Sequence, residues 1–133
     1  MSAPLVAIAK EDGPAEDRLR RWLDALVGAK HRKVFDDPEL FATYHALAEQ
    51  ARGVVDAHVQ ELVAQLRRIV ADGAREGVFG AVDPDAAARA VFDATVRFHH
   101  PAHSGEWHQP GIRAEYAGVV AVVVAGLRAG APN

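Results

Sequence analysis

Four histidines lie within ten residues of one another in the last third of the chain: His99, His100, His103 and His108. Neutral imidazole is a good ligand for zinc, nickel or copper, so this cluster is a candidate metal site. Pro101, however, breaks the helix between His99 and His103, which therefore do not form the rigid pair, four residues apart on one helix, of zinc enzymes. Histidines at a helix end or in a solvated loop also have an ordinary structural explanation. We expect no bound metal and no cofactor, and we keep His99, His103 and His108 as the metal candidates.

Two further histidines, His45 and His58, lie on or beside apolar faces of predicted helices. His45 follows Phe41 by four residues, and His58 stands between Val55 and Leu62 at helical spacing. A single histidine at such a position is more often a hydrogen-bonded core residue than a contact to a ligand. Both interpretations stay open for these two side chains.

Sequence motifs of enzymes are missing. The chain has no glycine-rich phosphate loop, no G-x-S-x-G elbow and no H-E-x-x-H motif. It has no cysteine, and its two serines, Ser2 and Ser104, have no evident base nearby in the sequence. We therefore expect a protein that is not an enzyme.

Composition favours one globular domain. The 133 residues are 50% hydrophobic and 25% charged, which is enough apolar material for a core. The net charge of −3 argues against direct binding of nucleic acid by this chain. The first ten residues lack the basic segment and long apolar run of a signal peptide, so we expect a cytoplasmic protein with no membrane contact.

Helix start and stop signals divide the chain into about five helices. Proline after aspartate predicts a helix start, and glycine or a following proline predicts an end. No alternating strand pattern is present, so we predict an all-α fold. The first predicted elements are a short helix around 5–8, which stops at Gly13–Pro14, and a helix over 16–33. The start signal at 36–39 (DDPE) opens a long helical pattern over 40–75, with a break near 50–53 and a glycine cap at Gly77. The last predicted elements are a helix that begins at Asp83–Pro84 and ends before Pro101, a loop over 101–109, and a helix from Pro110 to about Gly130.

The last helix has no polar side chain between Ala117 and Leu127. A helix that is apolar all round has no face for water, and this one is too short to span a membrane. Small residues recur along it at a spacing that lets another backbone come close: Ala117, Gly118, Ala121, Ala125 and Gly126. We infer that a second copy of the chain covers part of this helix; the alternative is a central helix wrapped by its own domain.

The order of these signals resembles the C-terminal domain of a TetR-type (tetracycline-repressor family) transcriptional regulator, from about Leu5 to Leu127. The resemblance is carried by residues 73–79 (GAREGVF), by Asp83–Pro84, by 88–92 (ARAVF) and by the apolar closing helix. It implies a bacterial regulator, such as a repressor, whose chain forms one effector-binding and dimerisation domain over residues 1–133. The family's N-terminal helix-turn-helix domain is missing, so DNA binding is expected only through that absent part.

The resemblance also implies where partners bind. The last two helices of each subunit would form a four-helix bundle across a two-fold axis, and an apolar pocket with a few polar groups would lie among the middle helices. For Trp22, Phe41 and Phe92, plain core packing is the alternative. The predicted residues of the effector pocket are Trp22, Leu26, Phe41, Tyr44, His45, Val55, His58, Phe92, Val96 and His99. The predicted residues of the homodimer interface are Tyr116, Val119, Val120, Val123, Val124 and Leu127.

The sequence is compatible with three functions. The first is an effector domain that binds a small, mostly hydrophobic molecule and thereby controls DNA binding by the missing helix-turn-helix. The second is a metal-binding helical bundle, which would bring His45, His58, His99 and His103 to one point. The third is a dimerising module with a filled core and no pocket.

Overall fold

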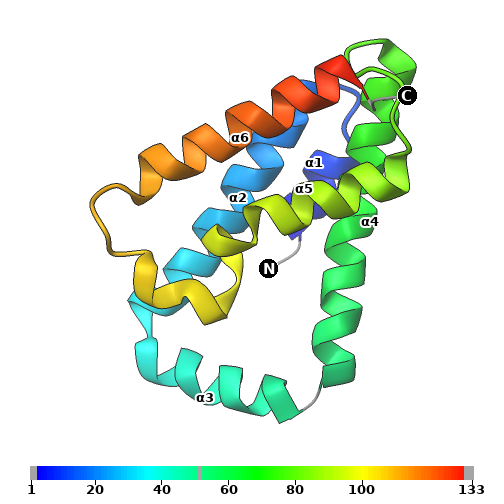
Figure 1. The fold of residues 1–133 in the computed structure, drawn as a ribbon. Coiled ribbons are helices and arrows are strands. Elements are labelled where there is room, and N and C mark those ends of the chain that lie inside the picture. The colour runs from blue at the N-terminus through cyan, green and yellow to red at the C-terminus, as the bar shows by residue number, and fades with distance from the viewer. Residues whose placement is uncertain (1–2, 51, 131–133) are drawn as a thin grey trace.

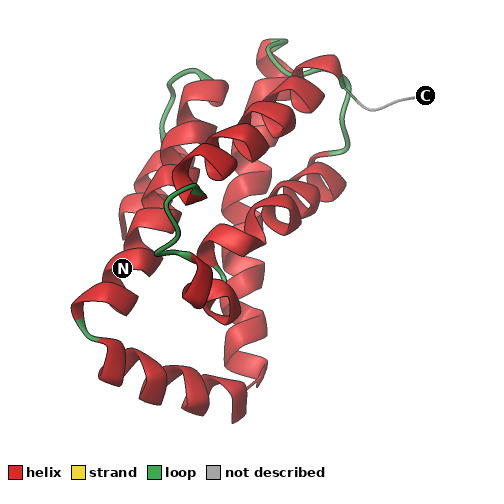
Figure 2. Ribbon diagram, turned by 60° about the vertical axis from the view of Figure 1, so that its left-hand side comes forward, coloured by secondary structure: helices red, strands yellow, loops and turns green. Residues whose placement is uncertain are grey.

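The computed structural model describes residues 3–50 and 52–130, and in this part of the chain all regular structure is helical (Figure 2). The predicted all-α fold is confirmed. The elements are α1 (Ala3–Lys10), α2 (Ala15–Asp36), α3 (Pro38–Gln50), α4 (Arg52–Glu76), α5 (Pro84–His99), the 3-10 helix η1 (Pro101–Glu106) and α6 (Ile112–Ala129).

The start and stop signals act as predicted at α5. The side chain of Asp83 accepts a hydrogen bond from the backbone N–H of Asp85, at 3.3 Å, and Pro84 occupies the first turn. At the other end, His100 has an extended backbone because it precedes Pro101. The break predicted near residues 50–53 falls at Ala51, which lies outside the described residues; α3 and α4 on either side of it run in different directions (Figure 1).

Two predicted boundaries were wrong. Residues 101–106, predicted as a loop, form η1, and the indole N–H of the following Trp107 donates to the carbonyl of Arg97 at 2.9 Å. The last helix begins at Ile112 rather than at Pro110. The N–H of Ile112 donates to the carbonyl of Gln109 at 3.2 Å, so Pro110 is a middle residue of a turn that leads into the helix.

The helices form a bundle with one outlying helix (Figure 1). Helix α4 packs against α1, α2 and α5, and α6 packs on α5. Helix α3 lies at the lower end of the view, spans from the end of α2 to the start of α4, and contacts both. The short helix α1 is fixed by Arg18 of α2, whose buried guanidinium donates to the carbonyl of Ala9 at 2.6 Å and pairs with Asp72 of α4 at 2.8 Å.

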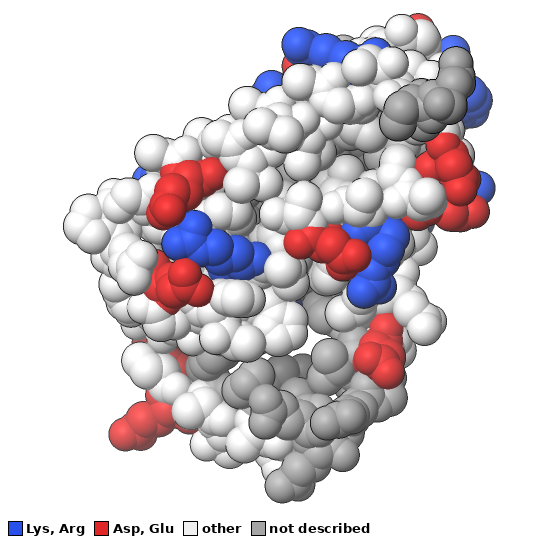
Figure 3. Space-filling view, in the orientation of Figure 1, with Lys and Arg blue, Asp and Glu red and all other residues white. Residues whose placement is uncertain are grey.

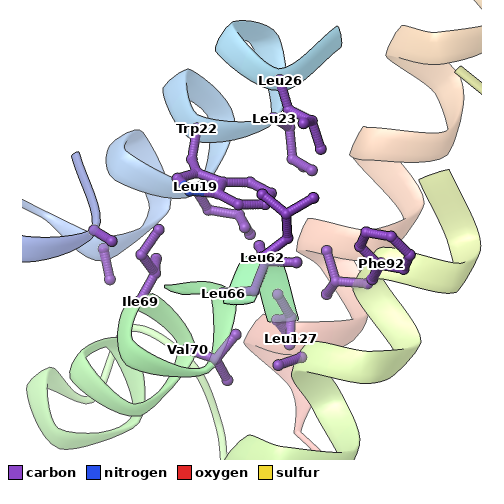
Figure 4. Close-up of a cluster of buried hydrophobic side chains, with 14 of the residues drawn as sticks. Leu19, Trp22, Leu23, Leu26, Leu62, Leu66, Ile69, Val70, Phe92 and Leu127 are labelled. Carbon is purple, nitrogen blue, oxygen red and sulfur yellow. The ribbon is translucent and has the colours of Figure 1, made fainter. Parts of the chain in front are cut away.

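The core lies between α2, α4, α5 and α6 (Figure 4). Leu19, Trp22, Leu23 and Leu26 point from α2 toward the leucines of α4 and toward Phe92 of α5. Their spacing of three and four residues places them on one face of α2, as the sequence predicts. The indole N–H of Trp22 donates to the side-chain oxygen of Gln65 at 2.9 Å, which satisfies its one polar atom.

Helix α4 ends in a turn that explains the 73–79 segment. Gly77 has a φ of 78°, a left-handed conformation that favours glycine. The N–H of Val78 donates to the carbonyl of Gly73 at 3.1 Å, and that of Gly77 to Ala74 at 3.3 Å, which together form a Schellman motif. Phe79 then folds back onto α4 so closely that a Cβ added to Gly73 would lie 2.1 Å from its ring.

Candidate functional site

Three polar side chains from three helices gather at the lower end of the core. Lys30 extends from α2, and its ammonium Nζ donates to Nε2 of His58 on α4 at 3.3 Å. His99 of α5 is close enough that the Lys30 charge contributes to lowering its pKa. We call Lys30, His58 and His99 the basic cluster. Apolar residues stand one turn away on each helix, among them Leu26 on α2 and Leu62 on α4.

The surroundings of the two histidines in this cluster lower both of their pKa values. His99 is only 3% exposed, and burial, with smaller contributions from the charges of Lys30 and His100, lowers its pKa to about 4. Its Nε2 lies 3.0 Å from the hydroxyl of Thr95, whose own proton has the carbonyl of Val91 as an acceptor. The pKa of His58 is lowered by desolvation and then by the Lys30 ammonium. Desolvation also lowers the pKa of Lys30.

The histidines of the 99–108 segment do not converge on one point. The ring of His103 lies 3.0 Å from Glu106, the ring of His100 accepts from the N–H of Ala102 at 3.0 Å, and the ring of His108 packs on Phe35. Among the side chains that the structure describes, which do not include His45, no group of three His, Asp or Glu residues is placed to hold a metal ion. This arrangement does not support the metal-binding alternative built on these histidines.

The residues predicted to line the pocket divide into three groups. Trp22, Leu26 and Phe92 are at most 6% exposed and belong to the core. His58 contacts Lys30, and His99 lies within range of its charge; Val96 is partly buried on α5, one turn before His99. The side chains of the remaining four lie outside the described residues: Phe41, Tyr44, His45 and Val55.

Two surface depressions lie elsewhere. One is formed between α4 and α5 by Val63, Arg67 and Asp85 with their neighbours. The other lies at the α1–α4 contact, where Arg18 and Asp72 meet exposed charged side chains. Neither includes a residue predicted to contact the effector, and acidic groups accompany the arginines in both.

Helix α6 has a buried face and an exposed face. Val120, Val124 and Leu127, predicted to meet a second subunit, are at most 6% exposed because they pack into the chain's own core. Tyr116, Val119 and Val123 are partly buried, and the hydroxyl of Tyr116 donates to Asp24 of α2 at 2.8 Å. In the single chain these three core residues have little free surface, and their place in a dimer interface stays a prediction.

The exposed face of α6 is made of small apolar residues. Val122 is 73% exposed. The other uncharged residues of this face are Ala114, Ala117, Gly118, Ala121, Ala125, Gly126 and Ala129. Figure 3 shows that the surface over α6 carries few charged side chains, whereas acidic and basic side chains gather below it over α5. A helix face of this kind offers water no hydrogen bonds.

Comparison with known families identifies the fold. The family model described as "Tetracyclin repressor-like, C-terminal domain" matches residues 15–120, which is most of the chain. The chain belongs to this family. No curated protein and no solved structure matches it. Tetracyclin repressor-like C-terminal domains typically bind small molecules and dimerise. In the described part of this TetR-like domain, no helix is long and apolar enough to cross a membrane.

Sequence reasoning missed two residues of the site. Lys30 follows Leu26 by four residues and Trp22 by eight, which places it on the core-facing side of α2. Thr95 precedes His99 by one helical turn, and its hydroxyl lies 3.0 Å from the ring of His99. Helical spacing is the signal that would have found both residues.

Proposed function

We propose that this TetR-like chain is the effector-binding and homodimerisation domain of a transcriptional regulator. The effector is a small, mostly apolar molecule that binds between α2, α4 and α5 beside the basic cluster. A helix-turn-helix domain supplied by another part of the regulator would bind the DNA. The observation that carries this proposal is the exposed apolar face of α6 on a chain of this family.

The dimer would form where small side chains allow close approach. Along α6, the residues opposite Val120 and Val124 are alanine, glycine and Val122, so two copies of the helix can pack with their backbones near each other. Packing would bury the apolar face that a single chain leaves exposed. Helix α5, which packs against α6, supplies the second helix of each subunit to a four-helix bundle.

Ligand binding has a direct structural route to the N-terminus. The proposed site contacts α4, and the buried Asp72 of α4 is paired with Arg18. Arg18 in turn holds the carbonyls of Ile8 and Ala9, at 3.2 and 2.6 Å, where α1 ends. A small shift of α4 on ligand binding would therefore move α1, which is the helix nearest to a preceding DNA-binding domain.

Native mass spectrometry of the purified chain, and of two variants, tests the proposal. We expect a dimer for the wild type and a monomer for Val122→Asp, because the substitution places two charges in the interface without touching the core. The matched control is Val78→Asp, another exposed valine at 41%, which should stay dimeric.

Bound mass provides the second readout of the same experiment. An organic adduct, or retention of an added apolar dye such as Nile red, supports an effector site. A wild-type monomer, or a Val122→Asp variant that remains dimeric, contradicts the proposed interface. A mass gain that matches zinc or nickel would instead favour the metal-binding bundle.

A further inference from the structure

Among the described residues, Lys30 differs from the other cations that are at least partly buried, because no carboxylate contacts it. Arg18 is buried, and Lys30 and Arg97 are partly buried, whereas the other described arginines and lysines are exposed. Arg18 pairs with Asp72 at 2.8 Å, and Arg97 pairs with Glu106 at 2.9 Å. Lys30 contacts an imidazole instead. A buried charge is normally paired, because removing it from water is costly.

Only one of the N–H donors of the Lys30 ammonium group has a described protein acceptor. An ammonium group carries three N–H donors, and one of them is directed to Nε2 of His58 at 3.3 Å. Within the described residues, no carboxylate contacts the other two donors. His58 and His99 are neutral at pH 7 and add no positive charge, so the basic cluster has a net charge of one. One negative charge would balance it.

A valine stands near each member of the basic cluster along its own helix. Val34 lies one turn beyond Lys30 on α2, Val59 follows His58 on α4, and Val96 precedes His99 on α5 by one turn. All three valines are partly buried, so each keeps some surface that a ligand can cover. The side chain of His58 is exposed, which opens the cluster to solvent on the α4 side.

We propose that the ligand is an apolar monocarboxylate, with its carboxylate bound to the Lys30 ammonium and its apolar body against Val34, Val59 and Val96. This inference rests on the proposed function and narrows the class of its effector. A single negative charge matches the single cation, whereas a phosphate group would bring more charge than the cluster neutralises. His58 positions the ammonium from the opposite side.

Isothermal titration calorimetry with paired probes tests the carboxylate. Hexanoate, decanoate and tetradecanoate are compared with the alcohols of equal length, below their micelle concentrations. A charge-assisted hydrogen bond changes affinity about tenfold to one-hundredfold. We therefore expect the tightest-binding carboxylate to bind about tenfold to one-hundredfold more tightly than the alcohol of the same chain length. The variant Lys30→Met should remove this advantage and leave binding of the alcohol unchanged.

The control is Lys33→Met, which removes the same charge from an exposed position three residues further along α2. It should retain carboxylate affinity within about twofold, because exposed charges are screened by water and salt. Equal losses in Lys33→Met and Lys30→Met would overturn the proposal, since only a general attraction to a positive surface would remain. Undiminished carboxylate binding by Lys30→Met would overturn it as well.

A second readout uses the wild-type chain and does not depend on a variant that folds. The Lys30 charge contributes to lowering the pKa of His58. A carboxylate bound to Lys30 would cancel that charge, so NMR titration should show the pKa of His58 rising with decanoate and unchanged with decanol. An unchanged pKa at saturating decanoate would contradict the assigned contact.

The outcome also separates this inference from the proposed function. If the chain binds Nile red at a defined stoichiometry but none of the three carboxylates, an effector site remains and the carboxylate assignment fails. If it binds neither the dye nor any carboxylate or alcohol, the effector-binding function itself fails.

Discussion

The buried imidazole of His99 makes the stability of this domain dependent on pH in a defined window. In the folded chain, burial lowers the pKa of His99 from 6.5 to about 4. Above pH 6.5 the ring is neutral in both the folded and the unfolded chain, so the full stability is present. Between pH 6.5 and 4, the unfolded chain binds a proton that the folded chain excludes, and stability falls as the pH falls.

The size of the effect follows from the two pKa values. Each pH unit between them corresponds to about 1.4 kcal/mol, so the complete loss on reaching pH 4 is about 3 kcal/mol. By pH 5 the loss from His99 alone is about 2 kcal/mol. Desolvation also lowers the pKa values of His31 and His58, which act in the same direction. The loss of about 2–3 kcal/mol from His99 is a large part of the free energy of unfolding of a domain of this size.

Urea unfolding at fixed protein concentration, followed by circular dichroism between about pH 7.5 and 5, measures this dependence. This range lies above the titration of the salt-bridged Glu11 and Glu106, whose pKa values are lowered from 4.5. The variant His99→Gln keeps a polar group near Thr95 but cannot bind the proton. Between pH 7.5 and 5, the free energy of unfolding of this variant should fall by about 2 kcal/mol less than that of the wild type.

The exposed His108 provides the matched control for His99→Gln. Its own replacement, His108→Gln, should leave the wild-type pH dependence in place. The reasoning is refuted if the wild type and His99→Gln lose the same free energy of unfolding between pH 7 and 5. It is also refuted if stability rises as the pH falls through this window.

Two further substitutions test how the helices are joined. Arg18→Met removes the buried partner of Asp72, which keeps the exposed Arg68 and Arg75 as partners, and should lower the free energy of unfolding by about 1.5–3 kcal/mol. Arg21→Met, which breaks only exposed pairs, should cost at most about 1 kcal/mol. Gly73→Ala places a methyl group against the ring of Phe79 and should cost about 1–3 kcal/mol, measured by urea unfolding.

The helix α6 provides the comparison for the glycine substitution. Gly118 has open space around its added Cβ, so Gly118→Ala should raise the stability of the single chain by up to about 1 kcal/mol. A stable Gly73→Ala variant would show that Phe79 can move away from α4. Equal costs for Arg18→Met and Arg21→Met would contradict the structural role assigned to the buried pair.

Local sequence signals predicted most of the fold. The proline-containing starts at Pro38 and Pro84, the glycine cap at Gly77 and the end of α5 before Pro101 all depend on the backbone preferences of one or two residues. The family was also recognisable from the order of these signals. The missed helix η1 depends on the packing of Trp107 against residues distant in the sequence, such as His31 of α2, and no local pattern contains that contact.

The candidate site was only partly accessible from the sequence. The family resemblance assigned His58 and His99 to one pocket, but the sequence gave no reason to join Lys30 to them, because the three residues lie on three different helices. The apolar last helix showed that much surface must be covered. It did not show which side its own chain covers, since Val120 and Val122 are the same residue type.

The amino-acid sequence by itself determined the long helices, most of their ends and the family, because backbone preferences and apolar spacing act over a few neighbouring residues. Only the tertiary structure decided that Val120 is core and Val122 is surface, and that Lys30 is a partly buried cation with no carboxylate contact among the described residues. Burial and electrostatic pairing depend on which helices surround a side chain, and residues far apart in the sequence set that arrangement.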